Sequence, residues 1–320
     1  MIKSYIVKHK SNKVRLQSRS GGAFTLISDW FIENGGIVYG CITGDDFLPY
    51  HTRADNATTR DKMRGSKYVQ SNLGVVFKEI KNDLINNKYV LFTGTACQVD
   101  GLLSYLNTQN IPTNNLFLVD IICHGVASPQ IWLDYLSLLA KKKRGKIEAI
   151  DFRNKKFGWT THFETITIDG KEYKSNAFKN LFFGKNILRP SCYNCPYKST
   201  NRISDITIGD AWGVNNSNTD FFDELGVSLV LCNTDKGVKL FNQFNIKAYF
   251  KECDINNYLQ PALLSNFSSP QKRNEFWKKY KTKGINYIVR WYSETNKLIV
   301  YLHKIKSKVC RALRRYEHEK

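Results

Sequence analysis

The chain has 320 residues, of which 24% are charged, and its 48 lysines and arginines outnumber its 28 acidic residues by 20. At this length roughly three quarters of the unfolded surface can be buried without disulfide bonds, and eight cysteines are too few for a secreted disulfide scaffold. Residues 1–18 contain no apolar signal segment, and no run approaches about 18 apolar residues. We therefore expect a cytoplasmic protein with reduced thiols and no membrane-spanning helix.

The positive charge is concentrated near the C-terminal end. Residues 270–320 carry 15 lysines and arginines against 4 glutamates, which accounts for +11 of the net charge of +20. A basic surface can attract nucleic acid, anionic lipid or phosphate-bearing cofactors, or it can reflect a lysine-rich proteome; we expect no nucleic-acid partner. Apolar residues repeat at helical spacing between the basic ones, at Ile299, Leu302, Ile305, Val309 and Leu313. Such a helix either docks on the protein or makes a peripheral contact with a membrane.

The N-terminal part opens with residues 1–19, which are polar and basic and predict a weak strand or an arm. Ser20, Gly21 and Gly22 then precede a helical pattern over residues 24–31. Ser20 is the expected N-cap, and the glycines would let backbone N–H groups approach an anion. Asn34, Gly35 and Gly36 should end this helix, and residues 37–41 should form a strand in which Cys41 is a small buried apolar residue.

Residues 64–71 combine arginine, glycine, serine and Lys67 ahead of a helix predicted over residues 73–84. Cations and hydroxyl groups beside a glycine suit a phosphate, but the same composition is typical of a solvated turn. The residues alone leave both interpretations open.

Residues 89–129 predict a strand–helix–strand unit. Two apolar runs, 90–92 and 116–122, are typical of buried parallel strands, and residues 99–106 have helical spacing between them. A cysteine follows each run, Cys97 after the first and Cys123 after the second. Because ligands bind at the carboxyl ends of the strands in open α/β sheets, we expect these two thiols to lie at one edge.

The remainder of the chain continues the α/β pattern. A helix over residues 131–140 should end at the basic run Lys141–Arg144, and an Asp169-Gly170 hairpin should join two strands of a β-rich segment. Cys232 and Cys253 have no partner at metal-binding spacing and are interpreted as structural. We predict an α/β fold with a mixed, largely parallel sheet flanked by helices, a β-rich insertion and a C-terminal basic helical extension. The segments behind this prediction are strands over 147–153, 162–168, 171–175, 204–213, 227–232 and 248–250 and helices over 176–183 and 238–244.

The cysteines carry the most specific chemical signal. Cys192 and Cys195 form a CxxC pair, which aims two sulfurs at one side of a tight turn. Together with Cys97 and Cys123 they supply four thiolates, a set that suits either a zinc ion or a [4Fe–4S] cluster. The cysteines by themselves do not favour iron–sulfur over zinc.

Five sequence blocks resemble, in order, those of the coenzyme F420 hydrogenase/dehydrogenase beta-subunit family. They are GSKYVQSNLG (65–74), LFTGTACQVDGLLSYL (91–106), LVDIICHGVASP (118–129), RPSCYNCPYKS (189–199) and SDITIGDAWG (204–213). Residues 18–40 look like the N-terminal module of the same family, so the resemblance covers about residues 15–265. It implies one FAD and iron–sulfur domain over 1–265, with an N-terminal module at about 15–85 and a C-terminal module at about 86–265, followed by a basic helical tail at 266–320.

The resemblance implies an iron–sulfur flavoprotein oxidoreductase. Such an enzyme passes electrons or hydride between an external reductant, ferredoxin-like or F420-like, and a small-molecule or glycan-linked substrate, with surface-polysaccharide biosynthesis as one setting. By position, Cys97, Cys123, Cys192 and Cys195 match the cluster cysteines. Blocks that would lie against FAD contain Ser20, Gly21, Gly22, Lys67 and Thr95. His124 and Asp210 fall near the cofactors and are candidate catalytic residues.

Two departures from the family pattern matter. Many bacterial members begin with a two-cluster ferredoxin module, which this sequence lacks, so we expect a separate electron carrier such as ferredoxin. The sequence TGTAC at 93–97 replaces the GTPC of many relatives but keeps the thiol. Two alternative hypotheses are a structural zinc site and a cofactor-free partner of a glycan assembly pathway at the membrane surface.

Overall fold

The computed structural model describes residues 2–293, which form two compact units. Within the described residues, unit 1 contains 2–126, Arg153–Thr161 and Arg189–Phe267, and unit 2 contains Ala127–Phe152, His162–Leu188 and 268–293. Within residues 2–293, no helix is both long enough and apolar enough to cross a membrane. The amphipathic repeat predicted at 299–313 lies outside the described residues.

Unit 1 is built on an eight-stranded sheet in the order β11-β1-β10-β9-β5-β4-β2-β3. The pairs β2–β4, β4–β5 and β5–β9 are parallel, and the flanking pairs are antiparallel. The α/β class and the mixed sheet are therefore confirmed. The strands are β1 (Lys3–His9), β2 (Ile37–Thr43), β3 (Pro49–Ala54), β4 (Val90–Thr95), β5 (Leu116–Ile121), β9 (Ile206–Asp210), β10 (Ser228–Cys232) and β11 (Ala248–Glu252).

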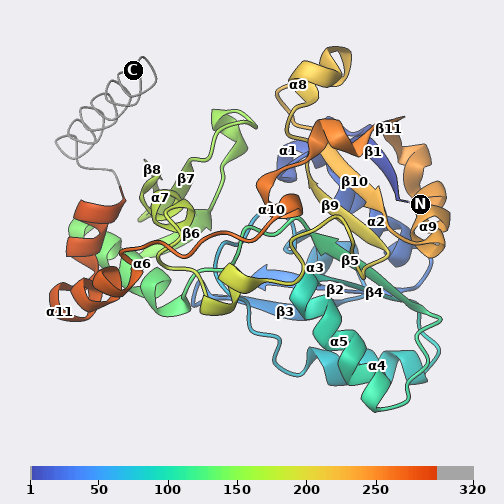
Figure 1. Cartoon of the computed structure of the whole chain (residues 1–320), viewed down its shortest axis with the longest axis horizontal. Helices are drawn as coiled ribbons and strands as arrows, with labels where there is room; N and C mark the ends of the chain where they lie inside the picture. Colours follow the sequence, from blue (N-terminus) through green and yellow to red (C-terminus); the bar gives the residue numbers. More distant parts are fainter. Residues whose placement is uncertain (1, 294–320) are drawn as a thin grey trace, which may run out of the picture. The chain divides into compact units, whose positions relative to one another are not determined.

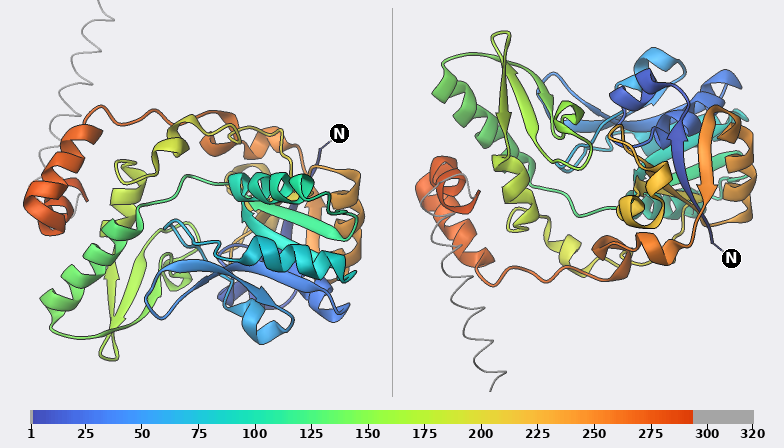
Figure 2. Two further views of the ribbon diagram at one scale, coloured as in Figure 1. Left: turned by 90° about the horizontal axis from the view of Figure 1, so that it is seen from below. Right: turned by 90° about the horizontal axis from the view of Figure 1, so that it is seen from above.

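Helices cover both faces of this sheet (Figures 1 and 2). On one face, α4 (Val76–Ile85) and α5 (Ala96–Thr108) bury residues such as Ile80 and Leu102 against β2, β4 and β5. On the other, α2 (Ala23–Glu33) and α9 (Asp235–Phe244) form a core in which Phe241 stacks on Tyr5, with ring centroids 4.1 Å apart. Two-sided burial explains why the central strands read as continuous apolar runs.

Of the two forms predicted for the N-terminus, a weak strand or an arm, the strand is present, but it is not weak. β1 is an interior strand that pairs with β10 on one side and β11 on the other, and its residues Ile6 and Val7 are fully buried. Charged residues at both ends of the strand conceal it in the sequence. The prediction of Ser20 as an N-cap is wrong, because α2 begins after Gly22, whose φ of 97° favours glycine.

Shorter elements connect these strands. Ser11 caps α1 and Asn56 caps α3, each through its side-chain oxygen. Asn34 and Gly35 end α2 as predicted. The short helices of unit 1 are α1 (Asn12–Gln17), α3 (Ala57–Asp61), η1 (Lys155–Phe157), η2 (Pro190–Asn194), α8 (Val214–Ser217), η3 (Thr219–Phe221), η4 (Asn245–Lys247), η5 (Ile255–Tyr258) and α10 (Pro261–Leu264).

Unit 2 combines a three-stranded antiparallel sheet with helices. The sheet consists of β6 (Ile147–Asp151), β7 (Glu164–Ile168) and β8 (Lys171–Ser175), and the predicted Asp169-Gly170 turn joins β7 to β8. The helices are α6 (Pro129–Lys143), α7 (Ala177–Phe183) and α11 (Arg273–Tyr292). Buried Glu164 links sheet to helices, because its carboxylate accepts hydrogen bonds from the Tyr135 hydroxyl at 2.7 Å and the Phe178 N–H at 3.0 Å.

Candidate functional site

The parallel pair β4–β5 places two cysteines at one edge of the sheet. Thr95 and Ile121, the last residues of these strands, are register partners. Cys97 follows two residues after Thr95, in the first turn of α5, and Cys123 follows two residues after Ile121. Both thiols therefore leave the same edge, as their spacing predicts.

The CxxC pair, Cys192 and Cys195, lies near Cys97 and Cys123. Cys192 lies in η2, and the backbone N–H of Cys195 donates to the side-chain oxygen of Asn266 at 2.9 Å. Burial is the largest cause of the raised pKa of Cys123, and negative charge on Cys192 or Cys97 raises it further. Burial is likewise the largest cause of the raised pKa of Cys192, and negative charge on Cys195 or Cys97 adds to it. Each sulfur thus lies within electrostatic range of others in the set, which we call the four-cysteine group.

Backbone N–H and hydroxyl groups approach these sulfurs. The Gly125 N–H donates to Cys123 Sγ at 3.3 Å, and the Thr95 hydroxyl lies 3.1 Å from Cys97 Sγ. Cys97 is exposed and the other three are partly buried. Burial raises the pKa of Cys123 to about 12, and the Gly125 hydrogen bond and the Lys198 ammonium only partly oppose this effect. Bound metal would favour thiolates at this site, since metal binding deprotonates cysteine.

The donor set fits an iron–sulfur cluster. Four thiols supply one ligand for each iron of a [4Fe–4S] cubane. Because each thiolate of a cubane binds a different iron, the sulfurs stand further apart than around a single zinc ion. Among residues 2–293, no three histidine, cysteine or acidic side chains are placed to share one metal ion.

His124 lies beside the four-cysteine group in the chain. Its ring stacks on that of Phe267, with centroids 6.1 Å apart and an angle of 9° between the ring planes. The ammonium of Lys198 lies 3.2 Å from the centroid of the same Phe267 ring and donates to the Cys123 carbonyl, also at 3.2 Å. The imidazole and the ammonium thus share one aromatic partner next to Cys123.

The Ser18–Gly22 loop contains three of the residues expected against FAD. The Ser20 hydroxyl donates to the Val227 carbonyl at 2.5 Å. A Cβ at Gly21 would come within 2.1 Å of the Val7 carbonyl, so this glycine lets the loop pack on β1. The Lys155 ammonium ties the loop to residue 225, donating to the carbonyls of Ser20 at 2.9 Å and Leu225 at 2.7 Å. The fold itself therefore accounts for the residue types at 20 and 21.

Lys67 and Thr95 occupy different surroundings. The Lys67 ammonium donates to the carbonyls of Met63 at 2.8 Å and Arg64 at 2.9 Å. Burial raises the pKa of Cys41, and the positive charge of Lys67 partly opposes this rise. Burial also lowers the pKa of His51, and the charge of Lys67 lowers it further. Thr95 is the N-cap of α5, in a capping box with Gln98. The structure thus places Thr95 with the four-cysteine group and Lys67 near Cys41 and His51, which are register partners on β2 and β3.

Asp210 has partners for both carboxylate oxygens. One accepts from the Arg153 guanidinium at 2.5 Å, and the other accepts from the Trp159 indole N–H at 2.9 Å. Trp159 in turn stacks on Trp212, with centroids 5.0 Å apart. Burial raises the pKa of Tyr68, and the next influences are the charges of Arg153, Asp210 and Arg19. Tyr68, which follows Lys67 in the chain, therefore lies within electrostatic range of Asp210 and Arg153.

A family model described as the C terminus of the coenzyme F420 hydrogenase/dehydrogenase beta subunit matches residues 87–258, more than half of the chain. The chain belongs to this family. A chain of the F420-reducing [NiFe] hydrogenase complex from Methanosarcina barkeri shares the fold of this F420 hydrogenase/dehydrogenase beta-subunit homologue, with a TM-score of 0.56 and 17% identity over 89% of this chain and 88% of that one. No curated protein sequence matches the chain.

The span matched by the beta-subunit family model contains the four-cysteine group, Thr95, His124 and Asp210. Ser20, Gly21, Gly22 and Lys67 lie before it. Membership places the protein among hydrogenase/dehydrogenase-type oxidoreductases.

Several buried charged residues were missed by the sequence reasoning, although they touch the predicted site residues. Lys155 contacts the Ser18–Gly22 loop, Arg153 pairs with Asp210, and Arg202 pairs with Asp120 beside the strand end that leads to Cys123. No local motif surrounds these residues. Their partners lie far away in the sequence, so only the folded chain reveals them.

Proposed function

We propose that the protein is an iron–sulfur flavoprotein that holds a [4Fe–4S] cluster on the four-cysteine group and FAD beside it. The observation that carries this proposal is that Cys97 and Cys123 follow paired strand ends, and that hydrogen bonds tie the segment just after the CxxC pair to the elements that carry these two cysteines. When bound, the cluster relays single electrons and the flavin carries a hydride.

The residues around the sulfurs would tune and shield such a cluster. The Gly125 N–H and the Thr95 hydroxyl approach two of the sulfurs, and hydrogen bonds to ligand sulfurs stabilise the more negative state of a cluster. The Lys198 ammonium, held at the Cys123 carbonyl, adds a positive charge in the same surroundings. Cys97 is the exposed member, so we propose that a partner exchanges electrons on its side.

For FAD, we propose contacts with Ser20, Gly21, Gly22, Lys67 and Thr95. Support comes from the basic side chains at the Ser18–Gly22 loop: the Lys155 ammonium donates to the Ser20 carbonyl, and the charges of Arg19 and Arg15 act on this ammonium. A positive potential of this kind favours the pyrophosphate of a dinucleotide. Thr95 belongs to both groups, which would bring the flavin next to the cluster.

The two candidate catalytic residues receive different roles. Because both oxygens of Asp210 are engaged, we propose that it positions Arg153 and Trp159 rather than moving a proton. His124 follows Cys123 directly and carries an imidazole, the side chain best suited to proton transfer near neutral pH. We therefore propose His124 as the proton donor or acceptor of the reaction.

Partners follow from the charge. A net charge of +20 favours an acidic electron carrier, such as a ferredoxin, with an F420-like reductant as the other option. The small-molecule or glycan-linked substrate, the role in surface-polysaccharide biosynthesis and the peripheral membrane contact stay predictions. Binding to vesicles with and without anionic lipid, and reduction assays with candidate glycan intermediates, would test them.

Anaerobic purification followed by iron, sulfide, zinc and flavin analysis tests the proposal. We expect about four iron and four sulfide per chain, brown colour with absorbance at about 400 nm, and bound FAD. Zinc in place of iron would support the alternative of a structural metal site and overturn the redox proposal. A colourless, metal-free and flavin-free protein that still folds would support the alternative of a partner protein for glycan assembly.

A further inference from the structure

The structure assigns to the buried Arg202–Asp120 pair a positioning role: it sets the spacing between the CxxC segment and Cys123. This inference rests on the proposed function, because it concerns the same four-cysteine group. Arg202 is a positioning residue whose hydrogen bonds go to Asp120 and to backbone carbonyls. Its action would pass through the backbone on either side of two proposed ligands.

One planar guanidinium holds both segments. Arg202 Nη2 donates to the Ile121 carbonyl at 3.0 Å, and Nη1 donates to the Tyr197 carbonyl. Ile121 lies two residues before Cys123, and Tyr197 lies two residues after Cys195. A rigid group that hydrogen-bonds both carbonyls limits how far these two parts of the chain can separate.

Asp120 fixes the orientation of that guanidinium. Its carboxylate lies on β5, is fully buried and accepts from Arg202 Nε at 3.1 Å. Nη2 of the same guanidinium lies 3.1 Å from the same carboxylate oxygen. Because β5 ends one residue later and leads to Cys123, the anchor of Arg202 belongs to the very strand that delivers this cysteine.

Two further contacts tie the same segment to the other cysteines. The Tyr197 hydroxyl donates to the carboxylate of Asp100, which lies three residues after Cys97 on α5. The Lys198 ammonium donates to the Cys123 carbonyl. Residues 197–202 therefore contact the elements of both single cysteines and continue directly from the CxxC pair.

Stability alone does not explain a charge pair at this place. The free-energy cost of removing two charges from water offsets most of their mutual attraction, so a buried ion pair is weak evidence for stabilisation. What the pair provides, and apolar residues could not, is a planar set of donors for two carbonyl groups next to proposed ligands.

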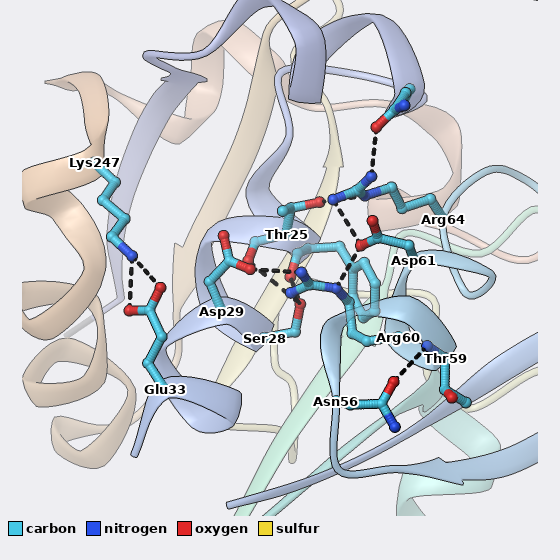
Figure 3. A network of polar contacts seen from close by, with 12 residues as sticks. Thr25, Ser28, Asp29, Glu33, Asn56, Thr59, Arg60, Asp61, Arg64 and Lys247 are labelled. Atoms are coloured by element: carbon cyan, nitrogen blue, oxygen red, sulfur yellow. Dashed lines mark hydrogen bonds and ion pairs between the residues drawn. The ribbon is translucent and has the colours of Figure 1, made fainter. Parts of the chain in front are cut away.

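Arg202→Lys tests the inference, because lysine keeps the charge but cannot donate to both carbonyls and Asp120 in one plane. The matched control is Arg60→Lys. Figure 3 shows Arg60, an equally buried arginine of unit 1, which contacts Asp29, Ser28 and Asp61 on α2 and α3. Both variants are purified anaerobically as the full chain, and three properties are measured: iron content, rate of iron release to a chelator, and cluster midpoint potential.

We expect Arg202→Lys to release iron about 10-fold faster or more and to change the midpoint potential, as loss of outer contacts does at other metal sites. Arg60→Lys should match the wild type in both. Equal behaviour of the two variants, with a cluster present in the wild type, would overturn the positioning role and leave the proposed function intact. A wild type without iron would instead overturn the proposed function.

The double variant Asp120→Leu/Arg202→Met separates positioning from folding. It removes both charges, so it avoids leaving one unpaired in the core. We expect its apoprotein to unfold cooperatively near the wild-type temperature while its iron release stays fast. A folded double variant with wild-type iron release and potential would contradict the inference.

Discussion

The four-cysteine group and the Ser18–Gly22 loop are built alike but differ in how their polar atoms are used. In both, distant segments of unit 1 meet, and both were singled out from sequence. In the loop, the Ser20 hydroxyl and the Lys155 ammonium donate to backbone carbonyls of the protein itself. At the cysteines, a hydroxyl group approaches Cys97 Sγ and a backbone N–H approaches Cys123 Sγ.

The difference teaches how to weigh a candidate site residue. Where the fold already uses a side chain fully, its residue type has a structural explanation that needs no ligand. A cluster of thiols has no such explanation, because thiols are weak hydrogen-bonding groups and gain little by meeting one another. The cysteines thus carry the functional proposal, and the loop supplies its surroundings.

The largest effect is expected from Cys192→Ser. A serine hydroxyl is a poor iron ligand, so the variant should lose most of its iron and its brown colour, while the large core keeps the chain folded. Iron analysis and circular dichroism measure the two outcomes. Cys253→Ser is the control, since this thiol is also partly buried but packs against the β1 side of unit 1. Full iron content in Cys192→Ser would remove this residue from the ligand set.

A smaller, pH-dependent effect is expected at the loop from Lys155→Met. Burial, together with Arg19 and Arg15, lowers the pKa of Lys155 to about 7, whereas an unfolded lysine titrates at about 10.4. Between these values the unfolded chain binds more protons, so the wild type gains stability as pH rises, by up to about 1.4 kcal/mol per pH unit. The variant lacks this contribution.

Urea unfolding of both proteins at several pH values between 7 and 10 measures the contribution of Lys155 to the pH dependence of the unfolding free energy. The unfolding free energy of the wild type minus that of Lys155→Met should increase as pH rises. Parallel curves would show that Lys155 does not titrate in this range. The comparison cancels the other titrating groups, which both proteins share.

The smallest effect is expected from Lys67→Ala. If Lys67 contacts the flavin, its removal should lower FAD retention after gel filtration, by a few-fold, with the iron content unchanged. Because its ammonium also donates to the carbonyls of Met63 and Arg64, a modest loss of stability should accompany this. Unchanged FAD occupancy would remove Lys67 from the proposed flavin site.

Much of the fold could be predicted where the signal is local. The apolar runs before Cys97 and Cys123 predicted parallel strands, because strands buried on both faces need apolar residues throughout. Asn34 and Gly35, and the Asp169-Gly170 turn, predicted a helix end and a hairpin from backbone conformations that these residues tolerate. The four cysteines could be grouped because β4 and β5 are adjacent and parallel.

The remaining features depend on contacts between distant residues. β1 is mostly buried although it carries Lys3 and His9 at its ends, since its neighbours come from the C-terminal part of unit 1. The Arg202–Asp120 pair joins residues 82 positions apart. Composition and periodicity describe a segment, not its partner, so neither could reveal these interactions.

The position of β1 also determines when unit 1 can be completed. Its Ser4 hydroxyl bonds the Cys253 carbonyl, 249 residues later, and both neighbouring strands leave the ribosome long after it. Contacts of such long range form slowly, and the first-made strand must wait with its apolar face uncovered. A nascent chain released before residue 252 would therefore lack a finished sheet, and chaperones and expression temperature should affect its yield.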